Sequence, residues 1–222
     1  MNVVARKLVF KELYVYRWFM VATAVAAALS MVAAAFGKAG FNIGALSWLT
    51  TIIAYGVMLA IYGIAQERKE NSLHFVMSLP VSPAEYVRAK LLGMLLCFLL
   101  PWLCASAAAV ALIFLAPGIP DGLAPYAILL CVYLFTNFTI VMCGTLHART
   151  DAIVAGIIIL TNMSVSLFLF AVSSAEDIKS HMGDASPTWN NAFFSILLVE
   201  ITVLVIAATL PLATAARRRD FL

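Results

Sequence analysis

The sequence contains few charged residues. Asp, Glu, Lys and Arg make up 11% of its 222 residues, whereas hydrophobic residues make up 64%. Soluble domains contain about 25% charged and roughly 45–50% apolar residues, so this chain lacks the polar side chains needed to cover a water-facing surface. The composition therefore predicts an integral membrane protein.

Cysteine is also scarce, and its positions exclude two kinds of site. All four cysteines lie within apolar stretches, where a thiol behaves as a small hydrophobic group. They form neither a CxxC metal motif nor the spacing of a disulfide framework. These residues are Cys97, Cys104, Cys131 and Cys143.

Three functional signatures are missing from the sequence. There is no GxxxxGK motif, so the chain cannot bind ATP through a P-loop of its own. No serine or histidine pairs with an acid inside an apolar stretch, as a catalytic group would require, and His74, His147 and His181 are too scattered for a metal or haem site. The net charge is only +3 and the charges form short clusters, which argues against a nucleic-acid surface.

Six apolar stretches are long enough to cross a bilayer, which takes about 20 residues per helix. They cover roughly residues 18–36, 46–65, 88–116, 123–147, 152–172 and 192–214. The predicted fold is therefore an all-α integral membrane protein with six transmembrane helices. An even number of spans places both termini on one side of the membrane.

The distribution of basic residues predicts which side that is, because Lys and Arg near span ends are retained in the cytoplasm. Twelve of the fourteen fall on the side of the N-terminus, and only Lys38 and Lys179 fall on the other. The twelve are Arg6, Lys7, Lys11, Arg17, Arg68, Lys69, Arg88, Lys90, Arg149, Arg217, Arg218 and Arg219. We therefore predict that both termini are cytoplasmic, and that residues 173–191 form a long outer segment with a short helix or re-entrant hairpin.

The first 17 residues mix bulky apolar side chains with five charges, which predicts an interfacial helix that leads into the first span. A signal peptide is the alternative, because small residues at Ala33, Ala34 and Ala35 resemble a cleavage site. The uninterrupted apolar run from Trp18 to Gly37 is longer than the core of a signal peptide. A retained first helix is favoured.

The cytoplasmic segment 66–85 carries a pattern of helix starts and stops. Ser72 is a good N-cap for a short helix that presents Leu73, Val76 and Met77 on one side, and Pro80 ends that helix. Ser82-Pro83-Ala84-Glu85 is a capping box that begins the third long helix. A crosswise helix between two long ones can transmit a push from a cytoplasmic partner, but the spacing alone equally fits an ordinary loop on the lipid headgroups.

This segment resembles the corresponding loop of type-2 ABC exporter permeases. In that superfamily a glutamate and a G-T/S-L stretch precede L-P-V-S and a basic residue. Here these places are taken by Glu67, Asn71-Ser72-Leu73, Leu79-Pro80-Val81-Ser82 and Lys90. Asn71 departs from the usual glycine, although asparagine is the next-best residue for a left-handed helix end. The basic ending Arg217–Phe221 is also similar to endings in the family.

The resemblance implies an architecture and a source of energy. Residues 1–17 would be an elbow helix, and residues 72–79 a coupling helix that contacts an ABC ATPase subunit. The contact residues implied in this way are Glu67, Ser72, Leu73, His74, Phe75, Val76, Met77 and Leu79. ATP and Mg²⁺ would be bound by two copies of a separate ATPase polypeptide, and this chain would carry no cofactor.

The resemblance also implies a location and an assembly. The chain would be a multi-pass protein of the plasma membrane, such as the bacterial inner membrane, and would pair with a second copy or with a sister permease. It would export an amphipathic or hydrophobic substrate by alternating access. Two alternatives stay open: a haem-delivery or cytochrome-maturation subunit of the same superfamily that does not pump, and an intramembrane enzyme.

Polar residues inside the predicted spans are candidates for a substrate pathway. Glu200 is the only acid well inside a span, where an ionisable group is costly and usually faces a protein interior or a wet cavity. A structural role in helix packing and a partial reach to the outer surface are its alternatives. Asn137 and Asn162 are weaker pathway candidates.

Hydrogen bonding between helices is the favoured role for Asn137 and Asn162 and for the polar side chains around them. Around Asn137 and Asn162 these are Thr136, Thr139, Thr161, Ser164 and Ser166. Pro101 and Pro211 are expected to kink or end the helices that contain them.

Overall fold

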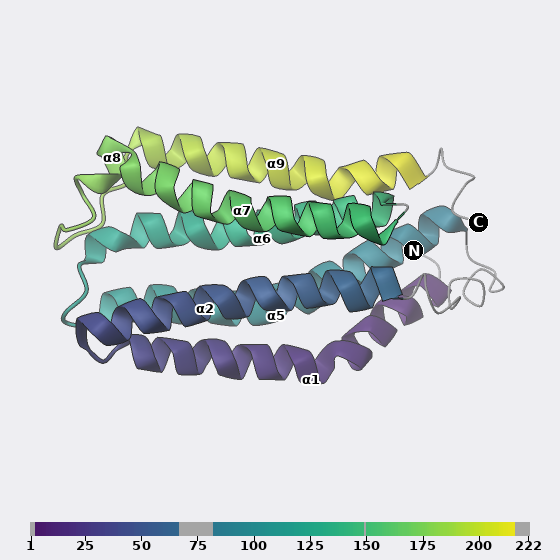
Figure 1. Cartoon of the computed structure of the whole chain (residues 1–222), viewed down its shortest axis with the longest axis horizontal. Coiled ribbons are helices and arrows are strands. Elements are labelled where there is room, and N and C mark those ends of the chain that lie inside the picture. Colours follow the sequence, from purple (N-terminus) through teal and green to yellow (C-terminus); the bar gives the residue numbers. More distant parts are fainter. Residues whose placement is uncertain (1–2, 67–81, 149, 216–222) are drawn as a thin grey trace.

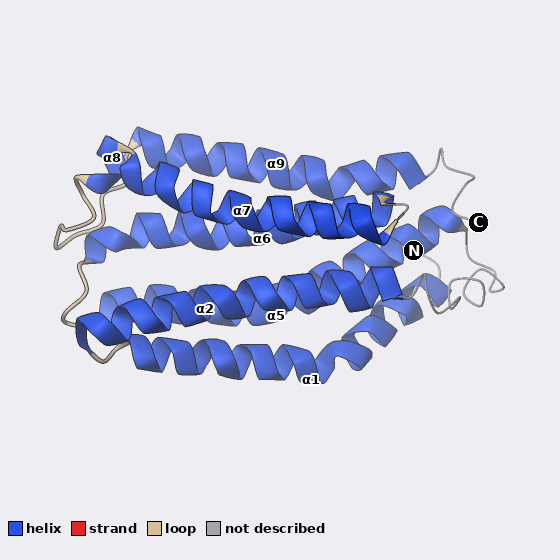
Figure 2. Ribbon diagram, viewed as in Figure 1, coloured by secondary structure: helices blue, strands red, loops and turns tan. Residues whose placement is uncertain are grey.

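The computed structural model describes residues 3–66, 82–148 and 150–215, and the regular elements in these ranges are helices. Six long helices lie side by side in one bundle (Figures 1 and 2). The elements are α1 (Val3–Ala34), α2 (Gly37–Ala60), the π-helix η1 (Ile61–Ala65), α5 (Pro83–Leu115), the 3-10 helix η2 (Asp121–Leu123), α6 (Ala124–His147), α7 (Asp151–Ser174), α8 (Glu176–Lys179) and α9 (Asn191–Ala215).

The prediction of six membrane spans is confirmed. In the described part of the chain, six helices are long and apolar enough to cross a bilayer, and each contains one predicted stretch. The described chain begins and ends at the same end of the bundle (Figure 1), as an even number of spans requires. We call this the terminal end. The opposite end, formed by residues 35–36, 116–123 and 175–190, is called the loop end.

The turn between the first two helices is shorter than the sequence predicted. The predicted spans leave residues 37–45 between them, but α2 already begins at Gly37, whose φ of 70° lies in the left-handed region that glycine adopts readily. The reason is that no residue between Lys38 and the predicted start of the span at Leu46 stops a helix. Gly40 and Gly44 instead lie directly against the α1 backbone, where an added Cβ would collide with carbonyl oxygens.

A single helix, α1, covers both the predicted elbow segment and the first span. The chain therefore shows no helix end near residue 17, although the N-terminal part of α1 bends away from the line of the rest (Figure 1). The interfacial position of residues 1–17 stays a prediction. Neither Pro101 nor Pro211 ends its helix, because α5 and α9 both continue beyond them.

Helix α6 lies at the centre of the bundle and contacts α2, α5, α7 and α9, whereas α1 packs on α2 and α5. The core between α2, α5 and α6 is built from stacked rings: the centroid of Phe98 lies 4.0 Å from that of Phe138 and 5.9 Å from that of Tyr55. Helices α7 and α9 leave many apolar side chains exposed, including Leu160 and Leu198. Such faces suit contact with lipid or with another protein.

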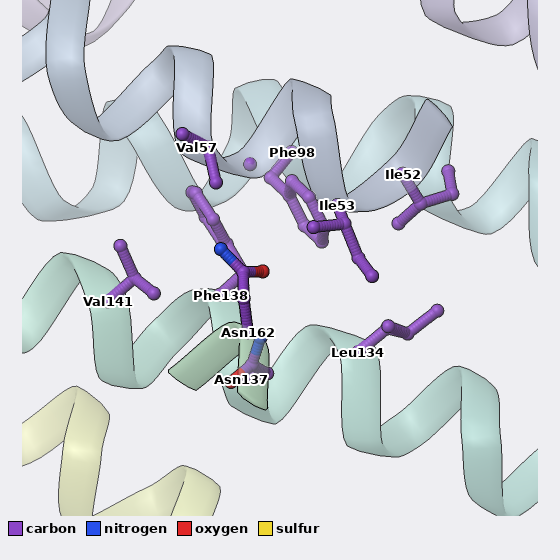
Figure 3. A pocket seen from close by; sticks show the side chains of 10 residues that line it. Ile52, Ile53, Val57, Phe98, Leu134, Asn137, Phe138, Val141 and Asn162 are labelled. Carbon is purple, nitrogen blue, oxygen red and sulfur yellow. The ribbon is translucent and has the colours of Figure 1, made fainter. Parts of the chain in front are cut away.

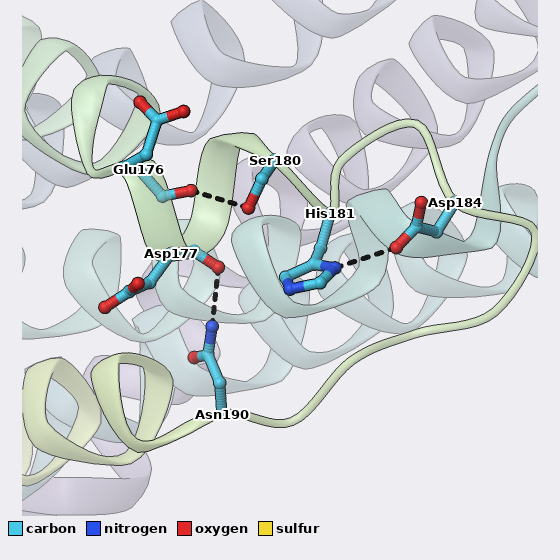
Figure 4. Close-up of polar contacts among 6 residues, drawn as sticks. All are labelled: Glu176, Asp177, Ser180, His181, Asp184 and Asn190. Carbon is cyan, nitrogen blue, oxygen red and sulfur yellow. Dashed lines mark hydrogen bonds and ion pairs between the residues drawn. The ribbon is translucent and has the colours of Figure 1, made fainter.

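The loop end is closed by a small polar network around α8 (Figure 4). The Asn190 side chain donates to the carbonyl oxygen of Asp177 (2.6 Å) and accepts from the backbone N–H of Phe193 (2.9 Å), which caps the start of α9. His181 and Asp184 form an exposed pair at 2.8 Å. Of the two structures predicted for residues 173–191, the short helix is the one present.

Candidate functional site

The predicted ATPase contacts lie outside the described residues. These are Glu67, Ser72, Leu73, His74, Phe75, Val76, Met77 and Leu79, so their role as a coupling helix stays a prediction. The structure describes the chain on both sides of them, up to Gln66 and again from Ser82. Both flanks contribute to the terminal end of the bundle.

The start of α5 is fixed by the predicted capping box. The Glu85 backbone N–H donates to Ser82 Oγ (3.2 Å), and the Ser82 backbone N–H donates to Glu85 Oε2 (3.1 Å). The two residues thus satisfy donors that the first turn of a helix leaves without partners. Helix α5 therefore has a defined start directly after the predicted coupling segment.

A buried ion pair joins α5 to α1 two turns further along. Lys90 Nζ lies 2.9 Å from Glu12 Oε1, and the two side chains are only 2% and 5% exposed. Lys11, which is 47% exposed, lies 3.5 Å from the same oxygen. Gly93 lets the helices approach, because an added Cβ would meet the Glu12 side chain at 2.9 Å. The family motif identified Lys90 but did not indicate that Glu12 is its partner, although Glu12 is the only acidic residue in the α1 sequence.

The end of α2 joins the same region through its π-helical turn. An added Cβ on Gly63 would collide with the Met94 side chain and come within 3.7 Å of Tyr16 Oη. Helices α1, α2 and α5 therefore meet closely at the terminal end, and π-helical turns of this kind are frequent at functional sites. Together, Glu12, Gly63, Lys90, Gly93 and Met94 form what we call the terminal junction.

Helix α5 continues through Pro101, where a side chain from α2 supplies the hydrogen-bond donor that proline lacks. Proline has no backbone N–H, so the carbonyl oxygen of Cys97, four residues earlier, has no helical donor from residue 101. Tyr55 Oη donates to this oxygen from α2 at 2.9 Å, in a buried position. Nothing in the sequence around Tyr55 indicates this role, which depends on how α2 packs against α5.

Other interhelical hydrogen bonds also come mainly from aromatic side chains. Trp48 Nε1 donates to the Ala105 carbonyl (3.1 Å), Trp102 Nε1 to the Cys131 carbonyl (2.9 Å), and Tyr133 Oη to Ser164 Oγ (2.7 Å). Of the residues expected to join helices, Ser164 does so. The prediction is wrong for Thr139 and Thr161, whose hydroxyls donate to carbonyls of their own helix. A hydroxyl close to its backbone finds that partner first.

Asn137 and Asn162 line one small cavity, between α2, α5, α6 and α7 (Figure 3). Its volume of about 20 Å³ is enough for roughly one water molecule. The Asn137 side-chain oxygen is buried and accepts no hydrogen bond within the described part of the chain. The two amides are thus brought together, but the cavity is too small for a substrate in this conformation.

Glu200 lies apart from that cavity. It belongs to α9, which packs against α6. The residue is 5% exposed, and neither carboxylate oxygen has a hydrogen-bond partner among the described residues. Its side chain therefore does not reach the outer surface, which removes one alternative.

The depth of Glu200 follows from helix geometry. His147 Nε2 and Thr214 Oγ1 lie 2.8 Å apart and join α6 to α9 near the terminal end. Tyr133 and Glu200 each precede their member of this pair by fourteen residues, about 21 Å along parallel helices. Thr136 lies on the same face, and its buried hydroxyl oxygen also lacks a partner within the described ranges. Helix geometry thus places these three residues at a similar depth in the bundle, and we call them the polar cluster.

The sequence profile of ABC-2 family transporter proteins matches residues 7–212, a range that includes four of the six spans entirely and most of the first and last. The chain belongs to this family. Neither a curated protein nor a solved structure matches it. Membership makes the chain a membrane subunit of an ABC transporter, and it implies partnership with an ABC ATPase. The resemblance that rested on the segment from Glu67 to Lys90 is confirmed at the level of the family.

Proposed function

We propose that this ABC transporter permease exports an amphipathic or hydrophobic substrate, driven by two ATPase subunits at its cytoplasmic face. The family match over residues 7–212 is the observation that carries the proposal, since it covers nearly the whole bundle. The sequence has no P-loop motif, so ATP and Mg²⁺ would be held by the partner. The chain itself would carry no cofactor.

The terminal junction supports a mechanism for coupling. Movement of residues 72–79 by an ATPase would act on α5 at the Ser82 cap. Because Lys90 is bonded to Glu12 within two turns of that cap, α1 would move together with α5. The push would thus tilt a pair of helices and change the access of the central pathway from the inner to the outer side.

The substrate pathway would form between two permease subunits, either two copies or this chain and a sister. The size of the cavity beside Asn137 and Asn162 supports this arrangement, because within one bundle that cavity holds only about one water molecule. The exposed apolar faces of α7 and α9 suit a subunit contact. Glu200, Asn137 and Asn162 would then act as polar contacts in an otherwise apolar wall.

The decisive experiment tests whether residues 72–79 hold the ATPase. A tagged permease with Leu73→Asp, Val76→Asp and Met77→Asp places three charges on the predicted contact side, where an unpaired buried charge is expensive. We expect normal insertion in the membrane but loss of ATPase co-purification and of substrate-stimulated ATP hydrolysis. The matched control is Ser78→Asp, which puts charge on the same predicted helix at a residue outside the predicted contact set. Full ATPase retention by the triple variant would refute the coupling assignment.

The proposed orientation has its own test. The plasma membrane location with cytoplasmic termini places Ser78 inside and Ser186 outside. Single cysteines at these positions, in a chain without the native four, should react with a membrane-impermeant reagent on intact cells only at Ser186→Cys. Labelling of Ser78→Cys would contradict the orientation.

A further inference from the structure

A large apolar cavity lies in the loop-end half of the bundle, away from the polar cluster. Its volume is about 330 Å³. It lies between α1, α2, α5 and α6 and is lined almost entirely by apolar side chains, including Met31, Phe41, Trp48, Leu112 and Leu130. The one strong donor among these five, Trp48 Nε1, is already bonded to the Ala105 carbonyl.

This lining excludes water as the natural content of the cavity. A buried water needs two to four polar partners, and an apolar cavity of roughly 150 Å³ already stays dry and accepts an apolar molecule such as benzene. The present cavity is about twice as large. Within a bilayer, the abundant apolar material that can fill such a space is a hydrocarbon chain.

A second, more polar hollow continues from this cavity to the surface at the loop end. The two share Ala34, Phe41 and Leu123 in their linings. The outer hollow adds Lys38 and Asn42 from α2 and residues 116–120 from the loop that follows α5. Lys38 is exposed and has no ion-pair partner within the described part of the chain. An apolar chamber thus opens into a mouth with a free cation and an amide.

We propose that this continuous hollow binds one phospholipid with an anionic headgroup. One acyl chain lies in the cavity beside Trp48, and the headgroup phosphate accepts hydrogen bonds from Lys38 Nζ and the Asn42 amide. A hydrocarbon chain gains no hydrophobic free energy by leaving a bilayer for an apolar cavity. The preference between lipids therefore comes from the mouth, and Lys38 selects negative charge.

This site differs from the proposed transport pathway. It contains none of Glu200, Asn137 and Asn162, and its occupation requires no ATPase. Binding can therefore be measured on the permease alone, and failure of the site leaves the proposed export function untouched. Failure of ATPase coupling likewise leaves the lipid site unaffected.

Quenching of tryptophan fluorescence by chain-brominated lipids tests the proposal. Replacing the exposed Trp18 and Trp189 by Phe leaves Trp48, which lines the cavity, and Trp102, which does not. The protein is placed in phosphatidylcholine vesicles that contain a small fraction of brominated phosphatidylglycerol or brominated phosphatidylcholine. We expect saturable quenching with a roughly fivefold preference for phosphatidylglycerol, the factor given by one lysine near an anionic headgroup.

Two matched pairs of variants separate the site from the surrounding lipid. Lys38→Gln should abolish the preference for phosphatidylglycerol, while Lys179→Gln at the same end of the bundle should keep it. Ala45→Phe fills the cavity and should remove the saturable quenching, while Ala39→Phe on the exposed side of α2 should not. Ala109→Leu fills the cavity from α5 and provides a second filling variant if Ala45→Phe does not fold.

Three outcomes would overturn the proposal. Equal quenching by the two brominated lipids in the parent protein would mean that Lys38 selects no headgroup. Saturable quenching that persists in both filling variants would place the lipid outside the cavity. An absence of saturable quenching in the parent protein would mean that something other than lipid, such as a second protein copy, covers the hollow.

Discussion

Two regions of this permease bury a carboxylate, and they treat it in opposite ways. At the terminal junction, Glu12 lies 2.9 Å from Lys90 Nζ, with Lys11 at 3.5 Å. In the polar cluster, the two oxygens of Glu200 have no partner within the described part of the chain. The two acids are similarly covered by protein, at 4% and 5% exposure.

The difference distinguishes a buried acid that stabilises the fold from one that destabilises it. A buried charge with a partner joins two helices, and removing the partner leaves a charge that the interior cannot solvate. A buried acid without a partner destabilises the bundle by itself, so folding does not account for its presence. Glu12 is accordingly a structural residue, and Glu200 is the better candidate for function.

The largest expected effect comes from breaking the buried pair. Lys90→Met leaves Glu12 buried without its close partner, and we expect a loss of about 3–5 kcal/mol in the free energy of unfolding. A denaturant titration in mixed micelles measures this loss. The double variant Glu12→Leu, Lys90→Met should recover most of it, because two apolar side chains of similar size can replace a buried ion pair.

Lys11 provides the matched control for that prediction. It lies near the same Glu12 oxygen, but it is about half exposed, so Lys11→Met should cost about 1 kcal/mol or less. If Lys11→Met and Lys90→Met were equally destabilising, burial of the pair would not be the source of its effect.

The opposite result is expected at Glu200. Glu200→Leu removes polar atoms that have no partner in the described bundle, so stability should rise by roughly 2 kcal/mol, the cost of an unsatisfied buried group. If Glu200 serves transport, substrate-stimulated ATPase activity should nevertheless fall. Glu200→Gln keeps the size of the side chain and should also lose activity, without the gain in stability. Full activity in both variants would show that the acid is dispensable.

The contrast between these two acids also shows what could be predicted from sequence. Hydropathy located all six spans, because the length and composition of a membrane helix are local properties. The Ser82–Glu85 box was found for the same reason: all its hydrogen bonds lie within four residues. Glu200 was recognised because an acid in an apolar run is itself a local anomaly.

The partners of these residues could not be predicted, because they depend on which helix faces lie together. Glu12 and Lys90 are 78 residues apart, and nothing near either one indicates the other. The start of α2 was missed because a single glycine can complete a turn and begin a helix, which composition alone does not distinguish from a longer loop.

An uncharged buried hydrogen bond provides a further prediction, which tests how α5 compensates for Pro101. Tyr55→Phe leaves the Cys97 carbonyl without its buried donor, and we expect a loss of about 1–2 kcal/mol. In a Pro101→Ala background the residue at position 101 regains an N–H that can donate to the same carbonyl. The cost of Tyr55→Phe should therefore shrink there, and a double-mutant cycle measures the change. Equal costs in the two backgrounds would show that the tyrosine does not replace the missing helical bond.

The smallest expected effect concerns the start of α5. Ser82→Ala removes the hydroxyl that accepts from the Glu85 N–H, and caps of this kind contribute about 1 kcal/mol or less when the site is exposed, as it is here. Global stability should hardly change, because Lys90 and Glu12 still hold α5 against α1. The efficiency of coupling should change more, since the ratio of transport to ATP hydrolysis depends on how firmly the segment before Ser82 is joined to the helix. Ser82→Asp keeps a capping oxygen and should restore that ratio, whereas Ser180→Ala, at the loop end, should leave it unchanged. A lowered ratio in Ser82→Ala with recovery in Ser82→Asp would place the cap on the route of force between ATPase and bundle. An unchanged ratio would confine its role to starting the helix.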